Sequence, residues 1–167
     1  FILSGIKSET EINTSVSWSS IPDAEITLAD FFDVTIGSLV AYRDPEEGPL
    51  FPYFHSKNCP VGATITATDE YRAYSGRTYT PPFIVIKRTS SPSDKNRAAA
   101  TLINLNELVA VENHLIVIRP KSTKIEDCQS LLKLLSTAEV NYFLNDRARM
   151  RHLTIETIKK IPFCLTL

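Results

Sequence analysis

The six residues Phe83-Ile84-Val85-Ile86-Lys87-Arg88 decide how this chain is organised. The first four are large and apolar, and three of them are β-branched, which is typical of a strand buried within a sheet. Two positive charges end the run, so the chain leaves the core at Lys87 and Arg88. The stretch therefore predicts a buried strand over 83–88 that delivers two cations to the surface.

Further short strands flank this one. Predicted strands cover 38–43 and 61–68 before it, and 98–103, 108–111 and 114–119 after it. The first two are separated by residues 44–60, which hold four prolines and one glycine and so predict a long loop. Loops of this length inside a compact domain are uncommon and are often functional.

Helical periodicity occurs mainly after residue 123. The predicted helices cover 27–32 with Thr27 as cap, 124–136 with Ser122 or Thr123 as cap, 137–148, and 155–160 after Thr154. Strands thus come first and helices last, which indicates an α+β domain. We expect a mostly antiparallel sheet followed by C-terminal helices. The sequence does not decide whether the sheet closes into a barrel.

Length and composition favour one folded domain. The chain has 167 residues, 43% of them hydrophobic, and a mean hydropathy of −0.05, which excludes a disordered protein. No apolar run approaches the roughly 18 residues of a membrane span. We expect an extended lead-in over 1–26 and a single domain over 27–167, cut from a longer chain because the sequence begins with Phe1. Three cysteines without a CxxC pair favour a reducing cytoplasm.

The net charge of −1 hides an asymmetry along the chain. Residues 1–50 hold two basic and nine acidic residues, whereas residues 51–167 hold 16 basic and 10 acidic ones. The first part is therefore at −7 and the rest at +6. Because binding follows the local field, a basic face could hold a polyanion despite the near-neutral total. The simpler alternative is a solvated basic face balanced by an acidic one.

Catalytic patterns are missing from the sequence. There is no G-x-G-x-x-G, Walker A or G-x-S-x-G spacing. His55 precedes Cys59 by four residues, but His114 and His152 stand apart, so no zinc-site or Cys–His spacing results. We therefore expect no catalytic residue, no metal site and no enzyme activity in this chain alone.

Three basic segments remain as candidates for DNA contact. The first is rich in tyrosine, the second carries hydroxyls beyond the 83–88 strand, and the third follows a predicted helix. Arginine bridges phosphates or binds guanine, and hydroxyls add backbone contacts. Packing of the tyrosines, solubility, and the dipole at a helix C-terminus are alternative explanations of the three segments. The candidate DNA-binding residues are Arg72, Arg77, Lys87, Arg88, Thr89, Ser90, Lys95, Arg97, Arg147, Arg149 and Arg151.

Several motifs together resemble a known family over about 27–163. They are the stretch 83–90 with Arg97 after it, Val111-Glu112-Asn113-His114-Leu115-Ile116-Val117-Ile118 before Pro120, Asn141-Tyr142-Phe143-Leu144-Asn145, Arg151-His152-Leu153-Thr154-Ile155, and Ile161-Pro162. The chain resembles the C-terminal target-recognition domain of adenine-specific DNA methyltransferases of restriction–modification systems, which are related to the recognition domains of type I specificity subunits. That resemblance implies sequence-specific binding to double-stranded DNA.

The catalytic part of that family does not carry over to this chain. The family binds S-adenosylmethionine and holds a flipped adenine with an Asn/Asp-Pro-Pro-aromatic motif. Thr80-Pro81-Pro82-Phe83 has threonine where the amide or carboxylate must be. The resemblance therefore implies a reading role, with S-adenosylmethionine and catalysis in a methyltransferase domain that acts in cis or in trans. The alternative is a protein-interaction domain that docks a partner through the helix containing Leu131 and Leu135.

Overall fold

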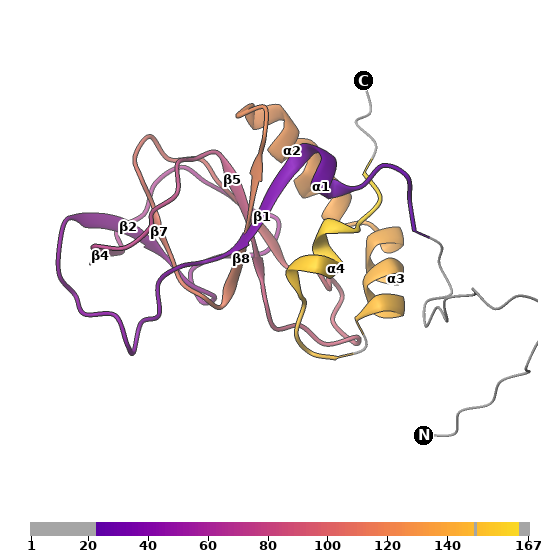
Figure 1. The fold of residues 1–167 in the computed structure, drawn as a ribbon, viewed down its shortest axis with the longest axis horizontal. Coiled ribbons are helices and arrows are strands. Elements are labelled where there is room, and N and C mark those ends of the chain that lie inside the picture. The colour runs from indigo at the N-terminus through magenta and orange to yellow at the C-terminus, as the bar shows by residue number, and fades with distance from the viewer. Residues whose placement is uncertain (1–22, 149, 164–167) are drawn as a thin grey trace, which may run out of the picture.

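The structure is a computed structural model that describes residues 23–148 and 150–163 (Figure 1). The prediction for residues 1–22 lies outside this range. The elements are α1 (Leu28–Phe31), β1 (Phe32–Ile36), β2 (Leu50–Phe54), β3 (Thr64–Ile65), β4 (Tyr71–Ala73), β5 (Phe83–Lys87), β6 (Ala100–Ile103), β7 (Ala110–Val111), β8 (Leu115–Pro120), α2 (Ile125–Leu135), α3 (Ala138–Arg147) and α4 (Ile155–Lys159). The predicted order of strands and then helices, and with it the α+β class, is confirmed.

The buried strand predicted at 83–88 is β5, and it lies at the centre of the larger sheet. The order of the five strands is β1-β8-β5-β6-β3, and β5 pairs antiparallel with both β8 and β6. Residues 83–86 are at most 1% exposed. Only β3 pairs in parallel, with β6, so the sheet is mostly antiparallel as predicted.

A smaller sheet lies at the far end of the molecule from the helices (Figure 1). Its order is β4-β2-β7, with β2 antiparallel to β4 and parallel to β7. In the described part of the chain the strands thus form two sheets, and no closed barrel is found there. The barrel-like closure, which the sequence had only left possible, is thus not seen in these residues.

The side chains of β5 point alternately to the two faces of the sheet and contribute to a separate hydrophobic cluster on each face. Ile84 and Ile86 pack with Leu131 of α2 and Ile158 of α4 on the helix side of the sheet. Phe83 and Val85 pack with a second cluster on the opposite side. Because successive side chains of a strand point to opposite faces, Lys87 at the end of β5 lies on the same face as Phe83 and Val85.

The N-terminal strands differ from the prediction. Residues 38–43 form an isolated bridge and a turn, and β1 instead begins directly after α1. At Gly37 the chain passes so close to the segment between β7 and β8 that an added Cβ would clash with the Glu112 carbonyl group. The predicted loop 44–60 contains β2, and the predicted strand 61–68 shrinks to β3. No strand was predicted at β4.

The helix starts mostly follow the sequence. Thr137 and Thr154 accept hydrogen bonds from Val140 N and Thr157 N, as N-cap residues do. At α2 the N-cap position is Lys124, and Ser122 Oγ accepts from Lys124 N without capping the helix. The predicted cap at Ser122 or Thr123 is therefore wrong. Within the described residues, no helix has the length and hydrophobicity needed to cross a membrane.

Candidate nucleic-acid interface

A hollow of about 660 Å³ lies beside the end of β5. Its lining combines apolar groups of β1 with cationic side chains and the segment that enters α4. The lining residues are Val34, Thr35, Ile36, Arg77, Arg88, His152, Leu153, Thr154, Ile155, Glu156 and Lys159. We call this hollow the basic groove.

Arg88 reaches the basic groove from the end of the central strand of the larger sheet, which is paired on both sides. Its backbone N–H donates to His114 O at 3.0 Å, and its Nη1 donates to Asn113 O at 3.2 Å. The side chain remains half-buried. Since the strand before it is fixed on both sides, little ordering of Arg88 remains to be done on binding.

Arg77 approaches the same groove from a separate loop. Its guanidinium lies 5.1 Å from the ring centre of Tyr79, and the Arg77 side chain is exposed. Tyr79 is 1% exposed, and its hydroxyl donates to Ile36 O at 2.9 Å. The tyrosine therefore packs onto the sheet, as the alternative reading of this loop had it, and it supports Arg77 at the surface.

The C-terminal basic segment folds back onto the chain that leaves β5. Ser90 N donates to Arg151 O and Leu153 N donates to Arg88 O, both at 2.8 Å. Thr89 and His152 form an isolated antiparallel bridge between these hydrogen bonds. Two basic segments that are about sixty residues apart are thereby joined, with Arg151 and His152 exposed beside Arg88.

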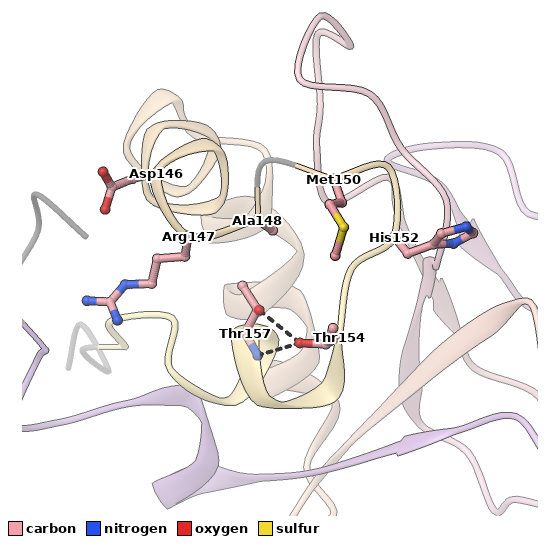
Figure 2. Close-up of a pocket in the computed structure, with 7 residues that line it drawn as sticks. All are labelled: Asp146, Arg147, Ala148, Met150, His152, Thr154 and Thr157. Carbon is pink, nitrogen blue, oxygen red and sulfur yellow. Dashed lines mark hydrogen bonds between the residues drawn. The ribbon is translucent and has the colours of Figure 1, made fainter. Parts of the chain in front are cut away.

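A second hollow of about 360 Å³ adjoins this segment on the α3 side. Figure 2 shows His152 at one end of it, Asp146 and Arg147 at the other, and Met150 between them. Arg147 lies 2.6 Å from Asp23 and over the ring of Phe143. Its hydrogen bond and charge hold the pKa of Asp23 below the usual 3.8. Arg147 is thus held at the end of the hollow away from His152 (Figure 2).

The charges lining the basic groove favour an anion. Arg77, Arg88 and Lys159 are cationic, and Glu156, which lies 2.9 Å from Lys159, is the acidic residue of the lining. Guanidinium groups stay charged at all relevant pH values and match phosphate in geometry. The partly exposed side chain of Ile36 could contact sugars or thymine methyl groups. This combination of a cationic rim and an apolar wall suits a nucleic-acid backbone with exposed base edges.

Two of the predicted DNA-binding residues are buried, and a third is largely covered. Arg97 is 0% exposed and Ser90 5% exposed, and they bond to each other. Arg72 donates to Ala41 O and Asp44 O and pairs with Glu46. Their positions give no support to direct contact with DNA, which stays a prediction for them. Their surroundings are those of residues that hold the fold together.

The other predicted residues do not all share one face. Lys87, the last residue of β5, alternates with Ile86 and so lies on the side of the sheet opposite the helices, whereas Arg88, the next residue, lines the basic groove. Thr89 and Lys95 are exposed in the loop after β5, and Arg149 lies outside the described residues. Lys159 was not predicted. Nothing local marks it, since it lines the groove only because α4 packs against β1.

Elsewhere, a polar cluster joins His55 to Glu70 at 2.7 Å and Asn58 to the same carboxylate at 2.8 Å. Cys59 lies next to it, but burial raises the pKa of its thiol to about 12, which does not suit a nucleophile. In the part of the chain that the structure describes, no three His, Cys, Asp or Glu side chains gather in a way that could hold a metal ion.

Comparison with known proteins adds evidence on the fold. No family model and no curated protein matches the chain. A solved chain from a study of complex assembly and conformational transition of the type I R-M system is 16% identical, with a TM-score of 0.53 over 81% of this chain and 32% of that one. The HsdS subunit from Thermoanaerobacter tengcongensis is 17% identical, with a TM-score of 0.51 over 81% of this chain and 31% of that one.

These likenesses show that the chain has a fold found in the HsdS subunit of a type I restriction–modification system. The fold that the sequence resemblance implied is therefore confirmed. The chain spans about a third of the length of the solved chains that it matches.

Proposed function

We propose that this chain is a DNA sequence-recognition domain of a restriction–modification system. One observation carries the proposal. The end of the central strand, with Arg88, and the returning segment with Arg151 and His152 build a single cationic surface beside the basic groove. The fold shared with a type I HsdS subunit supports the same conclusion.

The residues divide into two roles on such a surface. Arg77, Arg151 and Lys159 are exposed or half-exposed, and contacts from them to phosphates would fix the register of the duplex. Arg88 is held rigidly and half-buried, which suits reading of a base edge such as guanine in the major groove. The loop with Thr89 and Lys95 would add contacts next to it.

The partner in this proposal is a methyltransferase subunit or domain in the cytoplasm. S-adenosylmethionine would bind to that partner rather than to this chain. The guanidinium groups of the basic groove support this division, because they repel the sulfonium cation of the cofactor. The chain itself would position the duplex and carry out no chemistry.

Salt-dependent binding tests the proposal. Fluorescence anisotropy would follow a labelled duplex selected for binding from a randomised pool at two salt concentrations, because neutralising phosphates makes affinity fall steeply with salt. Arg88→Ala should weaken binding by about 1–3 kcal/mol. Arg43→Ala is the matched control, since Arg43 is an exposed arginine in the loop before β2. Equal affinities for both variants and the native chain would contradict the proposal.

A protein-interaction role has one observation in its favour. An apolar hollow of about 390 Å³ lies on the helical layer, lined by Leu134, Glu139, Val140, Tyr142, Phe143 and Pro162. The expected docking through Leu131 and Leu135 is not available, because both are buried in the core. Binding at the apolar hollow would be insensitive to salt, whereas binding at the basic groove would not be.

A further inference from the structure

Arg97 is the largest fully buried side chain among the described residues. Its Nη1 donates to Ser90 O at 2.7 Å and to Ser90 Oγ at 3.0 Å. Its Nη2 donates to Met150 O at 3.1 Å and to Ala148 O. One guanidinium therefore joins the loop after β5 to two points of the segment that follows α3.

The backbone of Arg97 is fixed as well. Arg97 N donates to Asn141 Oδ1 at 2.8 Å, and Asn141 Nδ2 donates to Lys95 O at 2.7 Å. The backbone N–H of Arg97 is thus bound to α3, and its guanidinium is bound to the segment after α3. Rotation of the side chain away from its acceptors would break bonds to two separate segments of the chain.

Burial of the Arg97 guanidinium is energetically unfavourable compared with an apolar side chain at the same position. Burying a guanidinium costs several kcal/mol unless its donors are satisfied, and an apolar residue of similar size often packs as well. What an apolar residue cannot do is hold carbonyl oxygens of two segments at fixed positions. The planar fork of arginine does so with several donors at once, and lysine, a single point charge, does not.

The segment that Arg97 holds is the one that faces the basic groove. Ala148 and Met150, whose carbonyls it binds, lie directly before Arg151 and His152. The next backbone bonds, Ser90 N to Arg151 O and Leu153 N to Arg88 O, continue the same pairing. Arg97 is therefore placed to set how the segment 150–153 lies against the end of β5.

We propose that Arg97 is a positioning residue for DNA recognition, which acts by fixing Arg151 and His152 next to Arg88 rather than by touching DNA. The inference rests on the proposed function. It explains why an arginine in a loop of otherwise solvent-exposed composition is buried. The two arginines thus have different roles, because the side chain of Arg88 reaches the groove without help from Arg97.

A double-mutant cycle tests this role. The probe is a labelled duplex selected for binding from a randomised pool, and affinities are measured by anisotropy well below the melting temperature of each variant. Arg97→Lys keeps the charge but loses the fork, and should weaken binding about tenfold. In the Arg97→Lys background, Arg151→Ala should then lose most of its own effect, since the segment is no longer held in place.

Arg88→Ala is the matched control for the cycle. Because Arg88 is positioned by β5, its effect should be the same with Arg97 or Lys at position 97. If Arg97→Lys fails to fold, Ser90→Ala replaces it in the same cycle. That change removes only the hydroxyl acceptor, and a loss of about threefold is expected.

The outcomes separate the two proposals. Wild-type affinity in Arg97→Lys and Ser90→Ala, or an unchanged effect of Arg151→Ala in both, would overturn the positioning role and leave DNA recognition standing. A lower melting temperature with unaltered affinities would show that Arg97 is structural only. Failure of the native chain to bind any duplex would overturn both the proposed function and this inference.

Discussion

Replacing Arg72 by methionine should destabilise the fold without acting on DNA directly. Arg72 donates to Ala41 O at 3.1 Å and Asp44 O at 2.9 Å, which fastens the loop before β2 to β4. Its guanidinium also lies 5.7 Å from the centre of the Tyr53 ring. Methionine keeps part of the packing and loses each of these polar contacts.

The magnitude follows from these contacts. A hydrogen bond from a charged donor contributes about 1.5–3 kcal/mol, and a cation–π contact at a surface about 0.5–1 kcal/mol. The ion pair with Glu46, whose side chain is 69% exposed, adds less than about 1 kcal/mol. Because water can reach the freed carbonyls in part, we expect a net loss of about 2–3 kcal/mol, which lowers the melting temperature by about 5–10 °C at this chain length.

Calorimetry or circular dichroism measures the shift, and Arg77→Met is the matched control. Arg77 is exposed, so its replacement should leave the melting temperature nearly unchanged and weaken binding to a duplex. The reasoning is refuted if Arg72→Met melts like the native chain and yet loses affinity and salt dependence. Arg72 would then contact DNA, as the sequence alone predicted.

Three further changes test the fold. Thr154→Ala removes the cap that accepts from Thr157 N and should cost about 1 kcal/mol in a denaturant titration; an unchanged stability with lower DNA affinity would instead show that Thr154 contacts DNA and does not stabilise α4. Gly37→Ala drives a Cβ against the Glu112 carbonyl and should cost at least about 3 kcal/mol, and a native melting temperature would disprove the close approach of the two segments. Asp23, Asp30 and Asp44 have carboxyl pKa values held below 3.8 by hydrogen bonds and nearby charge, so the folded state binds fewer protons than the unfolded one. The stability that they contribute is present above pH 3.8 and is lost as the pH falls through their folded pKa values, so melting temperatures measured down to about pH 3 should decrease, and a flat profile would contradict these shifts.

Local pattern was sufficient to predict the elements that are locally determined. The strand at 83–88 is apolar and β-branched, and Thr137 and Thr154 precede helical periodicity, so each could be predicted without knowing its neighbours. β2 could not. Its sequence contains Pro52, and it exists because β4 and β7, which are distant in sequence, pair with it.

The candidate site was predicted in part for the same reason. Arg88 follows from the end of a buried strand, which a sequence displays. Arg97 has the same charge and stands in a loop of hydroxyl and charged residues, so composition favours exposure. Its burial depends on carbonyls of Ala148 and Met150, about fifty residues further along the chain. Lys159 joins the groove only through the packing of α4 on β1.

Selection from a randomised duplex pool is the most direct test of the central claim, which is that this chain reads a DNA sequence. Repeated rounds of binding and amplification with the 167-residue chain should enrich one short consensus. The enriched duplex should bind more tightly than a scrambled version, and Arg88→Ala should reduce that difference. A pool that stays random after selection, with equal affinity for enriched and scrambled duplexes, would contradict the account.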